Sequence, residues 1–519
     1  MRVLPVFGRC QGMVSRIVPL IAAALVYCAV GFAAEKPNFI VINIDDMGYA
    51  DIGPFGSKLN RTPNLDRMAA EGMRLQCHYA APVCSPSRSA LMTGCYPKRV
   101  LPIPSVLFPA SAVGLNPNET TVAEVLKAEG YATACVGKWH LGDQPEFLPN
   151  AQGFDHYFGI PYSNDMGLRS EGSKSSLGDP IPPAKEVASK GVDPKLYGAD
   201  ETGLKGDTQP PLPLVEDGKV IDRIKQDGQQ SITQRYTEDA VKFIRASKGK
   251  SFFVYLPHSA VHFPIWPGRD FANKSPNGIY SDWVEEVDWS VGQVLDTVRE
   301  LGLDKNTLVI FTSDNGGTAR AVNAPLRGNK GSTWEGGMRV PTIAWWPGKV
   351  AAGSATMEIT SMMDILPTFA ALAGGKLPEK KIDGGDISPL LLGKAGAASP
   401  HADLFYYYRG LKLEAVRSGP WKLQLAGGDS PKGKQGKQPK AVKAATFPRL
   451  YNLADDIGES TDVAAQHADI VAKLQGLVEQ AKDDLGTDGV GPGCREMGRV
   501  EHPEPLIHHD GNIRTGFQP

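Results

Sequence analysis

The residue best suited to take part in a chemical reaction is Cys84, which begins the stretch CSPSRSALMTG at residues 84–94. Ser85 can cap a helix there, and Pro86 can occupy its first turn, where no backbone donor is needed. Cys84 would then lie beside free backbone N–H groups at the positive end of the helix dipole, where an anion is favoured. Arg88, one turn further on, adds a permanent positive charge. The pattern predicts a nucleophile for an anionic substrate, although such a pattern standing alone more often means a buried cysteine before a core helix.

Two apolar stretches, both predicted to be buried strands, are each followed by a pair of oxygen-bearing side chains. The pairs are Asp45 with Asp46 after residues 38–44, and Asp314 with Asn315 after residues 307–312. Open α/β sheets place their ligands at the carboxyl ends of strands. Carboxylate and amide oxygens without histidine or thiolate suit a hard divalent cation such as Ca²⁺ or Mg²⁺. Asp and Asn are also common in turns and caps, so one pair would decide nothing, but two pairs favour a cation site.

The C-x-P-x-R pattern at residues 84–88, continued by small residues up to 94, resembles the active-site motif of the type I sulfatases. In that family the cysteine is oxidised after translation to Cα-formylglycine (3-oxoalanine), and the hydrated aldehyde is the nucleophile. The resemblance therefore implies that a formylglycine-generating enzyme modifies Cys84. It also implies one bound cation, calcium rather than magnesium, with these ligands: Asp45, Asp46, Asp314, Asn315 and the modified Cys84.

Three further blocks match the same family, namely GKWHLG, PHSAVHFP and RGNKGSTWEGGMRVP. By this resemblance Lys138 steadies the formylglycine hydrate and the sulfate. His140 accepts a proton from the hydrate, so that the aldehyde re-forms and sulfate departs. His262 meets the bridging oxygen of the substrate, Lys330 binds the sulfate, and Arg88 helps to cradle it. These side chains would complete the catalytic set around Cys84.

The block GFDHYFGIPYSND resembles the arylsulfatase A and N-acetylgalactosamine-sulfatase branch of the family, in which a serine after Pro-Tyr reaches the sulfate. That nominates Ser163 as a substrate-binding residue. His258, Glu335 and Arg339 belong to matching blocks as well, but structural roles suit them better. The resemblance runs, with gaps, from about residue 39 to LYNLADDIGE at residues 450–459.

The resemblance implies hydrolysis of a sulfate monoester, either an aryl sulfate or a sulfated carbohydrate, to an alcohol and inorganic sulfate. A phosphodiesterase or phosphonate monoester hydrolase of the alkaline phosphatase superfamily is the nearest alternative, because some of these enzymes also use a formylglycine. Two-metal phosphatases need further Asp and His ligands, and here Lys138 and Lys330 fill the corresponding places. A non-catalytic glycan-binding protein with the same fold is the third possibility.

Strands and helices must alternate to bring these residues together. Apolar runs predict strands at 131–136, 252–256, 307–312 and 340–346, and helical spacing predicts helices at 64–73, 121–129, 231–246, 280–301 and 361–373. This order predicts a large, mostly parallel α/β sheet covered by helices on both faces, and the resemblance implies an alkaline-phosphatase-like fold. Short strands at 404–408, 414–416 and 421–425 and a helix at 468–485 predict a smaller C-terminal α+β subdomain built on an antiparallel sheet.

The domain organisation follows from these patterns. Residues 1–34, with three arginines before an apolar run that closes on small residues, predict a secretory signal peptide, with an uncleaved anchor as the alternative. A catalytic domain would span 35–398, with an irregular surface insertion at about 165–230, and a C-terminal subdomain and tail would span 399–519. We therefore expect an exported protein, periplasmic or secreted, with no stable membrane span after cleavage.

Charge and cysteine content add two limits. The formal net charge of −2 gives no argument for nucleic-acid binding, and the basic run at 432–443 predicts a solvated loop. Beyond the signal peptide five cysteines remain, Cys77, Cys84, Cys95, Cys135 and Cys494. An odd number in an exported protein leaves at least one cysteine unpaired or modified, but the sequence does not show which of the others pair.

Overall fold

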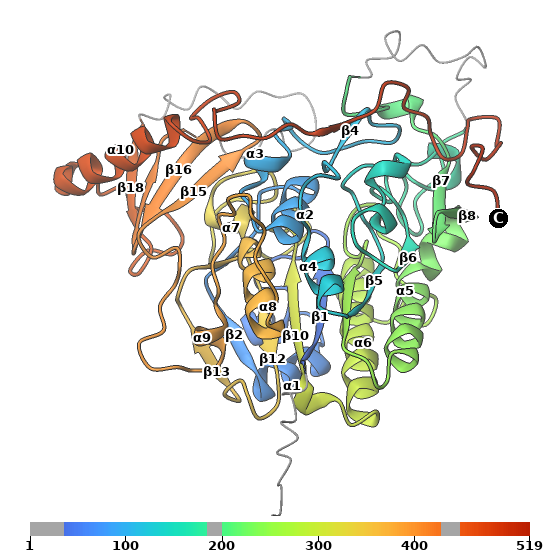
Figure 1. Ribbon diagram of the computed structural model, residues 1–519, viewed down its shortest axis with the longest axis horizontal. Coiled ribbons are helices and arrows are strands. Elements are labelled where there is room, and N and C mark those ends of the chain that lie inside the picture. The colour runs from blue at the N-terminus through green and yellow to red at the C-terminus, as the bar shows by residue number, and fades with distance from the viewer. Residues whose placement is uncertain (1–35, 184–199, 427–446) are drawn as a thin grey trace, which may run out of the picture. The chain divides into compact units, whose positions relative to one another are not determined.

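A ten-stranded mixed sheet organises the structure, a computed structural model that describes residues 36–183, 200–426 and 447–519 (Figure 1). The predicted signal peptide and the basic loop lie outside these residues. The strand order is β13 (Ser354–Thr356), β2 (Met73–Leu75), β12 (Ile343–Trp345), β10 (Thr307–Ser313), β1 (Asn38–Ile44), β9 (Phe252–Pro257), β5 (Ala132–Val136), β6 (His156–Gly159), β7 (Leu212–Glu216) and β8 (Lys219–Ile224). The central strands β10, β1, β9, β5 and β6 are parallel. Their carboxyl ends therefore open on one edge of the sheet, as predicted.

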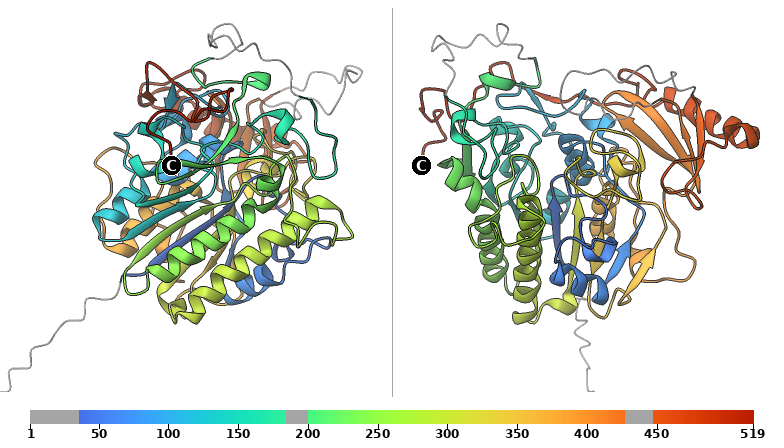
Figure 2. Two further views of the ribbon diagram at one scale, coloured as in Figure 1. Left: turned by 90° about the vertical axis from the view of Figure 1, so that its right-hand side faces the viewer. Right: turned by 180° about the vertical axis from the view of Figure 1, so that it is seen from behind.

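Strand β1 is buried on both faces, because its side chains alternate between two hydrophobic cores. Ile40, Ile42 and Ile44 face the core shared with α1 (Pro63–Glu71), α5 (Gln226–Ala246) and α6 (Ile279–Glu300). Phe39 and Val41 face the core shared with α2 (Cys84–Thr93), α4 (Val122–Ala128) and α8 (Ile365–Ala373). Figure 2 shows α5 and α6 side by side over their face of the sheet. This two-sided cover confirms the predicted layers.

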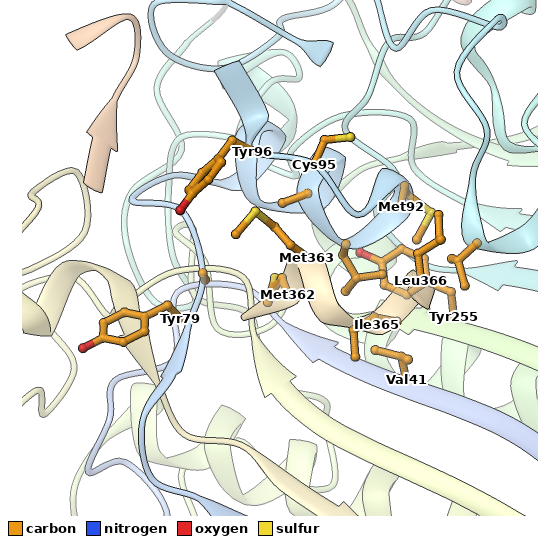
Figure 3. Close-up of a cluster of buried hydrophobic side chains, with 14 of the residues drawn as sticks. Val41, Tyr79, Met92, Cys95, Tyr96, Tyr255, Met362, Met363, Ile365 and Leu366 are labelled. Carbon is orange, nitrogen blue, oxygen red and sulfur yellow. The ribbon is translucent and has the colours of Figure 1, made fainter. Parts of the chain in front are cut away.

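Helix α2 presents Cys84 from a fully buried position. All ten of its residues are buried, and Met92 belongs to the same buried cluster as Met362, Met363 and Leu366, which Figure 3 shows. Gly94 ends the helix in the left-handed conformation, with φ 69°. The predicted capping role of Ser85 is wrong. Val83 precedes the helix without a side-chain cap, and the Ser85 hydroxyl instead accepts a hydrogen bond from Leu107 N at 3.2 Å.

The C-terminal region forms a separate antiparallel sheet of β15 (Phe405–Arg409), β16 (Lys412–Ser418), β17 (Trp421–Gln424) and β18 (Arg449–Asn452), with α10 (Ala468–Lys482) beside it. Strand β18 was not predicted. The last residues then return to the main sheet, where Val220 N donates to Phe517 O at 2.7 Å (Figure 1). The remaining short elements are α3 (Pro97–Val100), α7 (Glu335–Met338), α9 (Ser388–Leu391), β3 (His78–Tyr79), β4 (Val113–Gly114), β11 (Arg339–Val340), β14 (Thr360–Ser361) and β19 (Gly498–Arg499).

Two predictions of secondary structure need correction. The 165–230 segment is not irregular throughout, since β7 and β8 extend the main sheet and α5 begins at Gln226. Asp217 and Gly218, both with positive φ, form the tight turn between β7 and β8, and an Asp-Gly pair between apolar runs is the sequence signal for such a turn. The predicted strand at 340–346 divides into β11 and β12, and β12 pairs antiparallel with β10.

Two further observations concern membranes and disulfides. Within the described residues, none of the helices has the length and apolar character needed to cross a bilayer. The five cysteines of this part of the chain, Cys77, Cys84, Cys95, Cys135 and Cys494, are all free thiols.

Candidate active site

The acidic side chains predicted to bind a cation lie together at the carboxyl ends of β1 and β10. Ligand atoms within 4.8 Å of one another come from Asp45, Asp46, Cys84 and His262. Asn315 Nδ2 donates to Asp46 Oδ1 at 2.8 Å, which brings the second strand end into the same cluster. Asp46 holds a positive φ of 63°, a strained backbone conformation that is typical of functional sites.

Two buried oxygen atoms of this cluster have no hydrogen-bond donor among the described residues, Asp314 Oδ1 and Asn315 Oδ1. Both side chains are completely buried. A buried polar atom without a partner is costly and is found mainly where another ligand satisfies it. Carboxylate and amide oxygens are the donors that a hard divalent cation prefers, so this donor set fits such an ion.

Three basic side chains face the three carboxylates of the cluster. Arg88 donates to Asp314 Oδ2 from Nε at 3.0 Å and from Nη2 at 2.7 Å. Lys138 Nζ donates to Asp45 Oδ2, and Lys330 Nζ lies 2.5 Å from Asp46 Oδ1. Burial alone would raise the pKa of Asp45, but the cations, Lys138 foremost, hold it well below its usual value. Asp45 therefore stays ionised beside these basic side chains, whereas burial, and after it the neighbouring Asp45, raises the pKa of Asp314.

Cys84 lies between a carboxylate and a lysine. Its Sγ donates to Asp45 Oδ1 at 3.4 Å and accepts from Lys330 Nζ at 3.4 Å. Burial, and after it the carboxylates of Asp314 and Asp45, raise the pKa of the Cys84 thiol. The side chains around it therefore do not activate Cys84 as a thiolate, and an unmodified thiol there is a poor nucleophile. This differs from the expectation that the helix end and Arg88 alone would favour an anion.

His140 follows β5 with a positive φ of 65°. Its Nε2 lies 2.9 Å from Leu107 O, and a carbonyl oxygen only accepts, so Nε2 carries the proton. Nδ1 has no partner among the described residues. Burial, reinforced by Lys138 and Arg88, holds the pKa of His140 well below its usual value. His140 is thus a neutral imidazole with a free acceptor nitrogen.

His262 lies at the partly open side of the cluster, next to the buried Ser163. His262 Nδ1 lies 2.5 Å from Phe263 O and 3.3 Å from Ser163 Oγ, and its Nε2 lies 3.8 Å from Asp46 Oδ2. Ser163 Oγ also accepts a hydrogen bond from Lys138 Nζ at 3.1 Å. The structure thus brings all eleven predicted site residues to one edge of the sheet. His258, which was predicted to have a structural role, is not part of this group; its Nε2 lies 3.0 Å from Ser290 Oγ of α6.

Asp165 was not singled out in the sequence, although it stands two residues after Ser163. Its Oδ1 is buried without a hydrogen-bond partner among the described residues. Burial alone would raise the pKa of Asp165, but the nearby basic side chains of His262, Lys174 and Lys138 together lower it. Lys174, 3.8 Å from Asp165 Oδ2, lies in a Gly- and Ser-rich stretch that carried no usable pattern. Asp165 therefore belongs to the surroundings of His262, and Lys174 is its ion-pair partner.

A mostly parallel sheet with acid, amide and thiol groups at its strand ends, faced by basic side chains, is the arrangement of an α/β protein that binds its ligand at the carboxyl edge of the sheet. The chain belongs to the sulfatase family, whose model matches residues 37–375, and the model of the C-terminal region of aryl-sulfatase matches residues 399–497. It is a sulfuric ester hydrolase. The predicted family and its alkaline-phosphatase-like fold are both confirmed.

The chain resembles several characterised sulfatases over most of its length. It is 39% identical to arylsulfatase A of Homo sapiens over 459 residues, which are 84% of this chain and 85% of that protein. It is 37% identical to N-acetylgalactosamine-6-sulfatase of Mus musculus over 432 residues, 78% of this chain and 75% of that protein. The crystal structure of Ps i-CgsB in complex with k-i-k-neocarrahexaose superposes with a TM-score of 0.68 at 32% identity, covering 86% of this chain and 92% of that one. These relatives confirm the predicted branch.

Proposed function

We propose that this sulfatase acts through a formylglycine made from Cys84 and through one divalent cation, calcium rather than magnesium. The observation that carries the proposal is the position of Cys84 among three carboxylates and three basic side chains, beside two buried oxygens without donors. When present, the formylglycine hydrate supplies the nucleophilic oxygen, and the cation stabilises charge on the sulfate oxygens. Asp45, Asp46, Asp314 and Asn315 would hold the cation, together with modified residue 84.

The basic side chains bind and orient the sulfate in this proposal. Arg88, Lys138 and Lys330 balance the three carboxylates, so a divalent cation would leave a surplus of positive charge that favours an anionic substrate. Ser163 adds a hydroxyl beside Lys138. A protonated His262, whose Nε2 faces the cluster, gives its proton to the bridging oxygen of the departing alcohol. His140 has Nδ1 free to take up a proton as sulfate is released.

Mass spectrometry of the peptide that contains residue 84, from protein made in its native host, tests the proposal directly. We expect the mass of an aldehyde in place of the thiol, together with turnover of p-nitrophenyl sulfate by the same sample. Aryl phosphate mono- and diesters, assayed in parallel, should turn over more slowly, because the described residues contain one cluster suited to a metal rather than the two sets of ligands of a two-metal phosphatase. A plain thiol with no turnover, in a host that modifies other sulfatases, would contradict the mechanism and favour a glycan-binding role.

Two of the buried histidines, His140 and His258, provide a matched test of the His140 role. We expect His140→Ala to lower kcat for p-nitrophenyl sulfate by about 10²- to 10⁴-fold, because a positioned proton acceptor is lost. His258→Ala should lower the melting temperature and leave kcat within about threefold, because His258 contacts α6 and not the cluster. Steady-state kinetics and thermal unfolding of both variants check this. Equal losses of kcat in the two variants would contradict the assignment.

We further propose that the natural substrate is a sulfated carbohydrate. The similarity to an N-acetylgalactosamine-6-sulfatase and to an enzyme crystallised with a neocarrahexaose supports this class. Export to the periplasm or the exterior, through a signal peptide at residues 1–34, and maturation by a formylglycine-generating enzyme belong to the same proposal. So does the division into a catalytic domain at 35–398 and a C-terminal subdomain at 399–519. N-terminal sequencing of the secreted protein tests the cleavage.

A further inference from the structure

The segment that carries Lys330 is held by the C-terminal sheet. This segment, residues 325–338, lies between the active site on one side and strand β17 with the 453–459 turn on the other. Lys422 Nζ of β17 donates to Thr333 O at 2.8 Å. Glu459 Oε2 accepts a hydrogen bond from Glu335 N at 2.7 Å, and Glu459 O accepts one from Arg327 Nη1 at 3.0 Å. The C-terminal region therefore clamps the segment on both sides of Lys330.

The clamp is a buried charge cluster. Lys422 Nζ lies 3.0 Å from Glu335 Oε1 and 2.7 Å from Glu459 Oε1, and all three side chains are completely buried. Tyr407 OH donates to Glu335 Oε1 at 3.2 Å. Glu459 has a positive φ of 53°, a backbone conformation that persists only where the surrounding contacts hold the residue in place.

A buried cluster of this kind is weak evidence for stability, because apolar packing would stabilise the interface as well or better. Apolar contact is already present beside it, where Trp334 packs against Tyr451 and Leu453. Charged groups add something that apolar contact does not, since hydrogen bonds fix the direction and register of the backbone they hold. The cluster is therefore suited to set the position of the segment.

The other side of the segment is tied to the catalytic residues. Lys330 N donates to Gly317 O at 3.0 Å, in the turn that follows Asn315, and Gly331 N donates to Pro82 O at 2.8 Å, just before Cys84. The Lys330 ammonium contacts Asp46 Oδ1 and Cys84 Sγ. A shift of the backbone at Thr333 or Glu335 would move this ammonium relative to both groups.

We propose that Lys422 and Glu459 are positioning residues of the active site, which hold the Lys330 segment so that its ammonium meets the substrate sulfate. The inference rests on the proposed role of Lys330 in binding sulfate. The C-terminal sheet then helps to form the sulfate site. Glu335 and the 450–459 block, to which the catalytic mechanism assigns no role, hold the Lys330 segment in place.

A double-mutant cycle between Glu459 and Lys330 tests the proposal in the mature enzyme. We expect Glu459→Ala to raise both the KM for p-nitrophenyl sulfate and the inhibition constant of inorganic sulfate by about tenfold, with kcat within about threefold. Glu459→Gln keeps an oxygen that can accept from Glu335 N, so it should restore most of the affinity. In a Lys330→Ala background, Glu459→Ala should have no further effect on either constant, because its effect acts through Lys330.

Asp462→Ala is the matched control. Asp462 Oδ1 accepts from Leu450 N of β18 and from Ala464 N, so its loss weakens the same region without touching the Lys330 segment. It should lower the melting temperature and leave KM unchanged. If Glu459→Ala fails to fold, Thr333→Val tests the same idea by removing the hydrogen bonds of Thr333 Oγ1 with Glu414 and Gln424, both at 2.9 Å.

The outcomes separate the inference from the proposed function. An unchanged sulfate affinity in Lys330→Ala would overturn the role of Lys330 itself. If Lys330→Ala has a strong effect but KM is unchanged in Glu459→Ala or Thr333→Val, only the positioning role is overturned. Full additivity of the two effects in the double variant would overturn it as well.

Discussion

Replacement of Cys84 by alanine is expected to lower kcat/KM for p-nitrophenyl sulfate by at least about 10⁴-fold, because loss of a covalent nucleophile has effects of this size in other hydrolases. Cys84 is buried, and its side chain contacts Asp45 and Lys330, so its replacement removes the one group that these neighbours hold in the position of the nucleophile. The three basic side chains remain in place, so binding of inorganic sulfate should weaken far less than turnover. Steady-state kinetics and sulfate titration of the same preparation separate the two effects.

Cys494→Ala is the control for this experiment. Cys494 is a half-buried thiol whose Sγ donates to Leu485 O at 3.5 Å, in the C-terminal region, and its replacement should leave turnover unchanged. The folded state of Cys84→Ala is checked by its melting temperature, because a small side chain is removed from a completely buried position. Retention of more than a hundredth of the native kcat/KM by a folded Cys84→Ala protein would contradict a nucleophile at residue 84.

Part of the candidate site could be predicted because its residues follow local patterns with a direct physical meaning, whereas Lys138, His140, His262, Lys330 and Ser163 were expected only from the family resemblance. Asp45 and Asp314 follow apolar strands, and parallel pairing of β1 with β10 necessarily brings such strand ends together. Cys84 begins a helix that Gly94 ends. The prediction from local sequence that Ser85 caps the helix was wrong, because its hydroxyl accepts a hydrogen bond from the distant Leu107 N. Local patterns thus locate elements more reliably than they assign individual hydrogen bonds.

The clamp around Lys330 could not have been predicted in this way. Glu335 and Glu459 are 124 residues apart, and Glu335 and Lys422 are 87 residues apart, so no spacing in the sequence connects them. The matched blocks predicted only that Glu335 has a structural partner. Identifying that partner as Lys422 requires the register of β17 against its neighbours, which depends on tertiary packing. Strands β7 and β8, the last two of the main sheet, were missed for a different reason, because Gly- and Pro-rich flanks concealed the two-residue turn between them.

Removal of divalent cations by a chelator should abolish turnover without unfolding the protein. The protein stays folded because Lys138, Lys330 and Arg88 already neutralise the three carboxylates of the site. Addition of Ca²⁺ should restore activity and raise the melting temperature, since a ligand at about 100 times its Kd stabilises the native state by about 2.7 kcal/mol. The thermal shift gives a readout that does not depend on the modification of Cys84.

Asn315→Ala sharpens this prediction, because Asn315 Oδ1 is one of the two buried oxygens without a donor. We expect the Ca²⁺ concentration for half-maximal activity, and that for half of the thermal shift, to rise together by at least about tenfold when this ligand is lost. Asn116→Ala, which removes an exposed amide bonded to Glu496 O, should leave both concentrations unchanged. A chelated enzyme that retains full turnover, or an Asn315→Ala variant with native Ca²⁺ dependence in both measurements, would show that the oxygens at the end of β10 do not hold the ion.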